Sequence, residues 1–285
     1  MESFTKGFAT LRINGSTSAV YLRDEESCFV TEYQDVGDLL NSDIELSNLV
    51  FELNRRGKST GYSMYDFAPL IKTPSKIIGL GLNYLDHIAE MGRTAGGFPT
   101  LFAKFADSLT GPYSDIELPE VSGEVDYEAE MAIIIGKMGK DVPVKDALGM
   151  VGGFCCSNDV SMRDFQWRTS QFLQGKIFDA STPLGPVLVQ GSDVDYGGDL
   201  AIRSLVNGVE RQSSRTSMMI FSPADIIAYI SQIITLRPGD VILTGTPGGV
   251  GAGLDPPTFL KGGDAVKCEI EGLGSINNIF KLKIA

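Results

Sequence analysis

Short runs of apolar residues, separated by glycine, proline and aspartate, recur along most of the chain after residue 75. Their length and their β-branched content are typical of strands. The expected strands are IELP, AEMAIIIG, FCCSND, GPVLVQ, LAIRSLVNG, DVILTGT, AVKCEIEG and INNIFKLKI. One segment, SPADIIAYISQII, predicts a helix instead, with Ser222 as N-cap and Pro223 in the first turn. Many short strands and few helices predict an α+β fold that is predominantly β, rather than a doubly wound sheet.

The N-terminal part of the chain has a different pattern. FATLRI and SAVYLR alternate apolar and polar residues, and DIELSNLVFELNRRG carries leucines at helical spacing. Pro69 and Pro74 then bracket a short connector. We therefore expect a small α+β domain of residues 1–72 and a larger domain of residues 73–285.

Composition narrows the classes of partner. The formal net charge of −12 and a pI near 4.6 should repel polyphosphate, so we do not expect nucleic acid as a partner. The chain starts without the pattern of a signal peptide and has no apolar run of bilayer length, which favours a cytoplasmic protein without a membrane partner. The four cysteines lack zinc-ligand spacing and are expected to be buried free thiols.

Two glycine-rich segments resemble nucleotide motifs only in part. GLGLNY lacks the third glycine and the acidic residue of a dinucleotide fingerprint, which argues against NAD binding. TGTPGGVGAG, residues 244–253, has no P-loop lysine. Its backbone N–H groups could form a nest for a carboxylate, and a flexible surface turn explains the same residues equally well.

Three carboxylates stand beside predicted buried strands. Glu128 and Glu130 are two apart at the start of AEMAIIIG, so both side chains would leave one face of that strand. Asp159 follows FCCSN, where a turn could bring it alongside them. Converging carboxylates repel one another unless a cation lies between them. Oxygen ligands favour Mg²⁺, Mn²⁺ or Ca²⁺ over zinc, although Glu-x-Glu more often marks a solvated strand face.

The single histidine, His87, lies in NYLDHIAEMG. Asn83 could cap a short helix here, and three-residue spacing would place His87 and Glu90 on one helical face. A carboxylate in that position can orient an imidazole for proton transfer. The alternative is an ordinary surface histidine. The next residues, Arg93 to Pro99, are glycine-rich, as a mobile lid would be.

Two cations could complete a site for an anionic substrate. Arg163 lies four residues beyond Asp159 and could bind a substrate carboxylate in bidentate fashion, or could form a structural ion pair with Asp164 or Asp159. Lys176 has glycine and apolar neighbours, which predicts a buried lysine that needs a partner or a function.

These segments together resemble the fumarylacetoacetate hydrolase superfamily, in particular bacterial-type members with a small N-terminal domain. The resemblance runs from about Lys76 to Phe280. It rests on KIIGLGLNYLDHIAEMG, VDYEAEMAIIIGK, SNDVSMRDFQ, GKIFDASTPLGP, VNGVERQ, MIFSPADIIAYIS and LRPGDVILTGTPGGVG with FLKGGDAVKCEIEGLG. It implies a mixed β-sandwich roll, a homodimer and a place in aromatic catabolism.

The resemblance also implies roles for individual residues. The implied metal ligands are Glu128, Glu130 and Asp159, with Mg²⁺ or Mn²⁺ expected and Ca²⁺ possible in crystals. The implied catalytic residues are His87, Glu90 and Lys176, and the implied substrate-binding residues are Arg163, Gln166 and Thr246.

The leading functional hypothesis is a metal-dependent hydrolase that cleaves a C–C bond in acylpyruvates, with a small 2-oxo acid as substrate. An enolate stabilised by the ion would be the sink for electrons, and His87 would activate water. Oxaloacetate decarboxylation or tautomerisation and 2-hydroxy-dienedioate isomerisation use the same enolate and form the alternative. A third possibility is a non-catalytic binding protein with a structural Ca²⁺.

Overall fold

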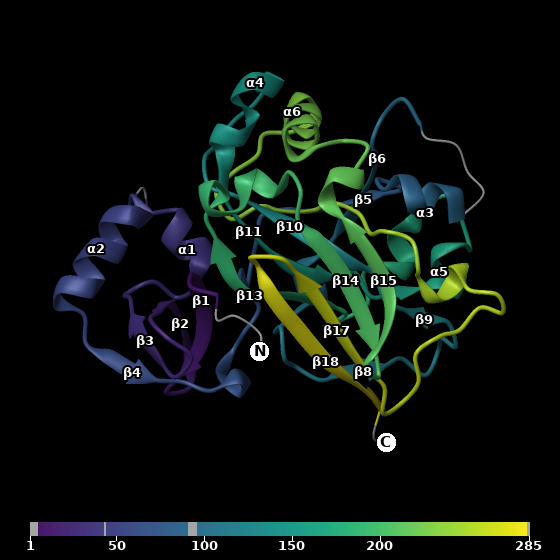
Figure 1. The fold of residues 1–285 in the computed structure, drawn as a ribbon, viewed down its shortest axis with the longest axis horizontal. Coiled ribbons are helices and arrows are strands. Elements are labelled where there is room, and N and C mark those ends of the chain that lie inside the picture. Colours follow the sequence, from purple (N-terminus) through teal and green to yellow (C-terminus); the bar gives the residue numbers. More distant parts are fainter. Residues whose placement is uncertain (1–4, 43, 91–95, 284–285) are drawn as a thin grey trace.

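The computed structural model describes residues 5–42, 44–90 and 96–283, and within them eleven strands form one mixed sheet (Figure 1). Ten of these strands follow one another across the sheet, and β7 (Leu109–Thr110) pairs beside β13. Their order is β4 (Ser59–Gly61), β3 (Ser27–Val30), β2 (Ser16–Leu22), β1 (Phe8–Ile13), β13 (Thr182–Val189), β11 (Val151–Asn158), β10 (Ala129–Ile135), β16 (Val241–Leu243), β5 (Ile77–Gly81) and β6 (Thr100–Lys104).

The centre of this sheet is buried on both faces. Every residue of β10 is buried, and Ile133, Ile134 and Ile135 are each fully inaccessible. β10 pairs antiparallel with both β11 and β16. Alternation of polar and apolar residues is absent here because neither face of the strand meets water.

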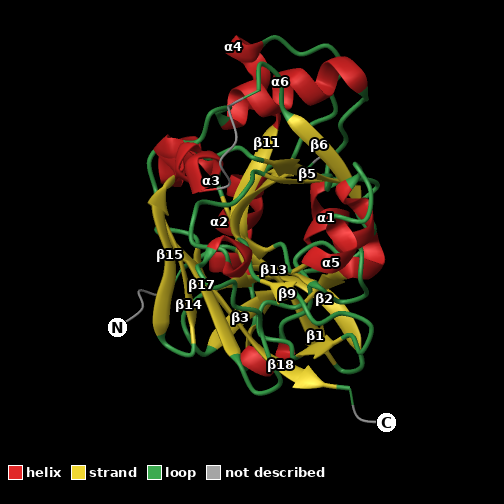
Figure 2. Ribbon diagram, turned by 90° about the vertical axis from the view of Figure 1, so that its right-hand side faces the viewer, coloured by secondary structure: helices red, strands yellow, loops and turns green. Residues whose placement is uncertain are grey.

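A second sheet of five described strands packs across the first (Figure 2). Contacts of β10 and β11 with β14 and β17 join the two layers. The strands in order are β15 (Val209–Arg215), β14 (Ala201–Val206), β17 (Ala265–Ile270), β18 (Gly274–Leu282) and β8 (Ile116–Leu118), and a separate pair joins β12 (Ser161–Met162) to β9 (Val125–Asp126). The predicted fold, predominantly β with layered mixed sheets, is confirmed.

The longest helices match the predicted ones. α6 begins after Ser222, whose hydroxyl accepts from the Asp225 N–H while the Asp225 carboxylate accepts from the Ser222 N–H, a capping box. The described α-helices are α1 (Val36–Leu40), α2 (Leu46–Arg56), α3 (Leu85–Glu90), α4 (Val144–Ala147), α5 (Arg163–Gln166) and α6 (Pro223–Ile233). Among the described segments, no helix combines the length and apolar character needed to cross a bilayer.

The N-terminal domain, which contains β1 to β4 with α1 and α2, lies at one side of the molecule (Figure 1). Its sheet is continuous with that of the larger part, because Phe8 on β1 pairs with Leu188 on β13. The connector between Pro69 and Pro74 is also bound to this sheet, because the Thr10 hydroxyl on β1 donates to the Leu70 carbonyl at 2.7 Å. The division at residue 72 stays a prediction.

The cysteines are buried free thiols, as predicted. Burial raises the pKa of the Cys28 thiol to about 11, with a smaller contribution from Asp66. Such a thiol is rarely ionised and is poorly reactive.

Candidate active site

The three predicted metal-ligating carboxylates converge. Glu128 directly precedes β10, Glu130 is the second residue of that strand, and Asp159 directly follows β11. Antiparallel pairing of these strands brings the segments together, and the Asp159 N–H donates to the Glu128 carbonyl at 2.9 Å. One oxygen from each carboxylate lies within 4.8 Å of the others, and all three side chains are buried.

Two buried lysines face these carboxylates. Lys176 places its Nζ 2.7 Å from Glu128 Oε2 and 2.8 Å from Asp159 Oδ2. Lys104, on β6, places its Nζ 2.6 Å from Asp159 Oδ1 and also donates to the Lys176 carbonyl. Lys104 is not among the residues predicted from the sequence. The sequence nevertheless contains a sign of a buried lysine here. In TLFAKF a single lysine stands among mostly apolar residues, as Lys176 does in its own segment.

The charges are distributed unequally over the two glutamates. Burial opposes the charge of Glu128, but Lys176 and Arg163 outweigh it and lower the pKa of Glu128 to about 2. Burial, Asp159 and Glu128 all raise the pKa of Glu130 well above its usual value. Glu128 therefore favours its charged form, and Glu130 favours its protonated, neutral form.

Glu130 also provides a structural test of whether a cation fits. Its Oε2 accepts from the Gly245 N–H at 2.8 Å, whereas its Oε1 is buried without a hydrogen-bond partner. An unpartnered buried carboxylate oxygen is costly. A divalent ion between Glu128, Glu130 and Asp159 would satisfy it, and an all-oxygen ligand set suits Mg²⁺ or Mn²⁺.

His87 and Glu90 form a hydrogen-bonded pair on α3. His87 Nδ1 lies 3.1 Å from Glu90 Oε2, and the side chains are 9% and 18% exposed. Glu90 is itself held, because its Oε1 accepts from the Gly249 N–H at 2.9 Å. The pair leaves the second ring nitrogen of His87 available to a bound molecule.

Asn83 has a different role from the predicted helix cap. Its amide donates to the carbonyls of Thr244 and Phe221, and its Oδ1 accepts from the Phe221 N–H. It therefore ties the start of α3 to two distant segments, which local capping rules cannot anticipate. The predicted end of this helix near Met91 and residues 93–95 of the predicted lid lie outside the described residues.

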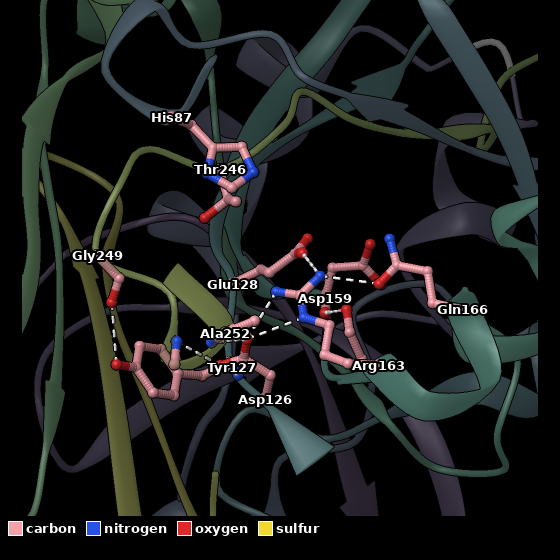
Figure 3. Close-up of polar contacts among 12 residues, drawn as sticks. His87, Asp126, Tyr127, Glu128, Asp159, Arg163, Gln166, Thr246, Gly249 and Ala252 are labelled. Carbon is pink, nitrogen blue, oxygen red and sulfur yellow. Dashed lines mark hydrogen bonds and ion pairs between the residues drawn. The ribbon is translucent and has the colours of Figure 1, made fainter. Parts of the chain in front are cut away.

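Arg163 forms buried ion pairs, as the alternative interpretation expected, but its partners are Asp126 and Glu128, and the predicted partners Asp164 and Asp159 were wrong. Its Nε and Nη2 each lie 2.9 Å from Asp126 Oδ2, and its Nη1 lies 2.7 Å from Glu128 Oε1 (Figure 3). Burial opposes the guanidinium charge, but these two carboxylates outweigh it and raise the pKa of Arg163. Asp126 and Arg163 meet because their strands pair. Asp126 is the last residue of β9, and β9 pairs with β12, which ends directly before Arg163.

Gln166 and Thr246 lie beside these groups. Gln166 Oε1 accepts from Arg163 Nη1 at 2.9 Å. The Thr246 hydroxyl donates to the Ala129 carbonyl and accepts from Gln212 Nε2 at 2.7 Å. Gln212 is a second residue that sequence reasoning missed, although VNGVERQ was among the segments that carried the resemblance.

The glycine-rich segment 244–253 is a nest for carboxylates of the protein itself. Gly245 donates to Glu130 and Gly249 donates to Glu90. Further along, the N–H groups of Gly251 and Ala252 donate to Asp126 at 2.7 and 3.0 Å. A flexible surface turn, the alternative interpretation, is inconsistent with these contacts.

A small cavity of about 40 Å³ joins most of these side chains. Six of the nine predicted site residues line it: His87, Glu128, Arg163, Gln166, Lys176 and Thr246. Glu90 lies behind His87, a lining residue to which it is hydrogen-bonded. Glu130 and Asp159 lie next to Glu128, which is also a lining residue. Phe102, Trp167 and Phe172 add aromatic surface, so the cavity is partly apolar.

Residues 76–281 match the family model described as fumarylacetoacetate (FAA) hydrolase, C-terminal. The chain belongs to the fumarylacetoacetate hydrolase family. A curated relative, the oxaloacetate tautomerase Fahd2a, mitochondrial, of Rattus norvegicus, is 48% identical over 217 residues, which cover 76% of this chain and 69% of that protein.

Two solved structures of the family share the fold. The 5-carboxymethyl-2-hydroxymuconate delta-isomerase from Mycobacterium smegmatis is 31% identical, with a TM-score of 0.77, and the match covers 98% of this chain and 100% of that one. Fumarylpyruvate hydrolase from Pseudomonas aeruginosa, in complex with Mn²⁺ and pyruvate, is 32% identical, with a TM-score of 0.67, over 73% of this chain and 90% of that one. Tautomerase, isomerase and hydrolase thus all occur among similar proteins.

Proposed function

We propose that this protein is a divalent-metal-dependent isomerase that interconverts the keto and enol forms of a small 2-oxo dicarboxylic acid such as oxaloacetate. The observation that carries the proposal is a hydrogen-bonded His87–Glu90 pair on the same small cavity as Glu128, Lys176 and Arg163. The tautomerase relative at 48% identity supports this reaction over C–C cleavage, which was our leading hypothesis from the sequence.

Glu128, Glu130 and Asp159 would hold Mg²⁺ or Mn²⁺. When bound, such an ion supplies Lewis acidity that stabilises negative charge on substrate oxygens. Three carboxylates can bind either ion. The Mn²⁺ in the fumarylpyruvate hydrolase structure supports a divalent ion in general.

The reaction moves one proton from C3 of the acid to the oxygen on C2, and no C–C bond breaks. With Nδ1 directed to Glu90, His87 uses its other ring nitrogen to take the proton from C3. The oxygen on C2 receives a proton from solvent, and His87 releases the C3 proton to solvent, which regenerates the base. Lys176 supplies a buried positive charge beside the developing negative charge.

The remaining residues bind and orient the acid. Arg163 brings positive charge to the cavity wall, and the Gln166 side chain and the Thr246 hydroxyl are polar groups on the same wall. Phe102 and Phe172 limit water next to the substrate carbon. Tautomerisation requires no water as a reactant.

The direct test follows the enol form of oxaloacetate by its ultraviolet absorbance. We expect the purified protein with Mg²⁺ or Mn²⁺ to accelerate equilibration, and a chelator to abolish the acceleration. A His87→Asn variant serves as the matched control, because it should fold and bind Mn²⁺ but not catalyse. Equal rates with the protein and with buffer would contradict the proposal.

An acylpyruvate hydrolase is the second candidate, and the fumarylpyruvate hydrolase neighbour supports it. The two reactions differ in product, because cleavage of acetylpyruvate gives pyruvate and acetate while tautomerisation leaves the acid intact. Pyruvate release faster than enol equilibration would favour the hydrolase.

A non-catalytic protein with a structural Ca²⁺ is disfavoured, because the three relatives compared above are all named as enzymes. Native mass spectrometry would test the predicted homodimer. The cytoplasmic location also stays a prediction, and the mitochondrial relative does not support it.

A further inference from the structure

Asp126 is a fully buried carboxylate without a part in the reaction described above. It is nevertheless the most heavily hydrogen-bonded acid beside the cavity. Its Oδ1 accepts from the N–H groups of Tyr127 and Gly251, and its Oδ2 accepts from Ala252 N–H and from the Arg163 side chain (Figure 3). Apart from that of the adjacent Tyr127, these donors come from two distant parts of the chain.

The first connection runs to the guanidinium group. Asp126 Oδ2 lies 2.9 Å from both Nε and Nη2 of Arg163, which fixes the plane of the group. The remaining nitrogen, Nη1, is thereby directed to Glu128 and Gln166. Without Asp126, the attraction of Arg163 to Glu128 would be unopposed, and the guanidinium would shift toward this candidate metal ligand.

The second connection runs through the glycine-rich segment to the histidine. Asp126 holds Gly251 and Ala252, and the neighbouring Tyr127 hydroxyl donates to the Gly249 carbonyl at 3.0 Å. The N–H of Gly249 then donates to Glu90, 2.9 Å away.

Close packing leaves this segment little freedom. A side chain at Gly249 would meet the Arg211 carbonyl at 2.0 Å, and one at Gly253 would meet Glu90 at 2.4 Å. Gly249 also has φ +101°, a conformation that favours glycine. Movement at residues 251–252 would therefore be transmitted to Gly249 and to Glu90.

We propose that Asp126 is a positioning residue that sets Arg163 and the His87–Glu90 pair together. It links the group that would bind the substrate carboxylate with the group that would move the proton, through one buried side chain. The effect on catalysis rests on the proposed function, whereas the effect on the two connected segments does not.

The experiment compares Asp126→Asn with Asp164→Asn. The first variant keeps the shape of the side chain but turns an NH₂ group toward donors. The second makes the same charge change next to Arg163, at a carboxylate that accepts from the Ser122 hydroxyl and lies outside this network. Hydrogen–deuterium exchange of peptides covering 85–90 and 247–253 reports the positions of the segments without any substrate.

We expect exchange in both peptides to rise at least about tenfold in Asp126→Asn, with strand β10 unchanged and Asp164→Asn equal to wild type. Turnover should fall about 10- to 100-fold, the usual effect of losing a group that orients a reacting residue. In the double variant with Glu90→Gln, the loss should be smaller than the product of the two single losses, because both act through His87.

Unchanged exchange in Asp126→Asn, or losses that multiply fully with Glu90→Gln, would overturn the proposal. If Asp126→Asn does not fold, Tyr127→Phe removes only the bond to Gly249, and unchanged exchange at 85–90 would overturn the connection to the histidine. A wild-type protein inactive on every 2-oxo acid would refute the proposed function instead, and the exchange result would still stand.

Discussion

Two clusters of ion pairs in this protein have nearly the same geometry and different surroundings. On the outer face of β14 and β17, Arg203 Nε lies 2.5 Å from Glu269 Oε2, and Lys267 Nζ lies 2.5 Å from Glu269 Oε1. At the candidate site, Lys176 lies 2.7 Å from Glu128. The Arg203 side chain is 52% exposed, whereas that of Lys176 is 3% exposed.

The two clusters differ in burial rather than in distance. Water screens the outer pairs and competes for their hydrogen bonds, so each contributes little. The inner charges have lost their water and depend on one another, so removal of one leaves another uncompensated. Strongly interacting buried charges of this kind are concentrated at functional sites.

Replacement of Lys176 by Met should have the largest effect. It keeps the length of the side chain and leaves Glu128 and Asp159 with less positive charge. The free energy of unfolding should fall by about 3–5 kcal/mol, the usual cost of breaking a buried pair. Urea denaturation of the metal-free protein measures it. A loss below about 1 kcal/mol would mean that the inner cluster behaves like the outer one.

Replacement of His87 by Asn should lower turnover about 10²- to 10⁴-fold, the range for loss of a general base. Replacement of Glu90 by Gln should lower it about 10- to 100-fold, because Glu90 only orients the base. Because neither residue is a candidate metal ligand, the affinity for Mn²⁺ should stay within about threefold of wild type. Initial rates and calorimetric titration with Mn²⁺ measure the two effects. Turnover near the wild-type value would exclude this pair from the reaction.

The binding of Mn²⁺ should depend on pH through Glu130. Its pKa is raised in the folded protein, first by burial and then by Asp159 and Glu128. Between the unfolded pKa, about 4.3, and the raised value, the folded metal-free protein holds a proton that the unfolded chain has lost. Its stability therefore falls as pH rises through this window.

A bound ion displaces that proton, so affinity for Mn²⁺ should rise by up to about tenfold per pH unit in the same window. Calorimetry in buffers of different ionisation enthalpy counts the protons released. In Glu130→Gln the affinity should be lower and its pH dependence flatter. Glu128 would not contribute, since its pKa is lowered to about 2. Binding without proton release would contradict the assignment of Glu130.

Replacement of Arg203 by Met should have the smallest effect. Its partner Glu269 keeps Lys267, and the Arg203 side chain itself is 52% exposed. The free energy of unfolding should change by less than about 1 kcal/mol, with turnover unaffected. Urea denaturation measures it. A loss of stability as large as that of Lys176→Met would mean that burial does not separate the two clusters.

Local patterns were sufficient for much of the fold. The apolar run of β10 predicted a buried strand, and Ser222 with Pro223 predicted the start of α6. Three-residue spacing predicted the contact between His87 and Glu90. These features depend on residues close in the chain, where backbone geometry alone sets the distances.

The sequence by itself therefore determined the fold class, the family and the types of group at the site. Only the tertiary structure decided their partners: Lys104 reaches Asp159 across 55 residues, and Gly251 reaches Asp126 across 125. Such contacts follow from which strands are neighbours and in what register. Burial between two sheets then sets which charges lose their water, and no local pattern contains that information.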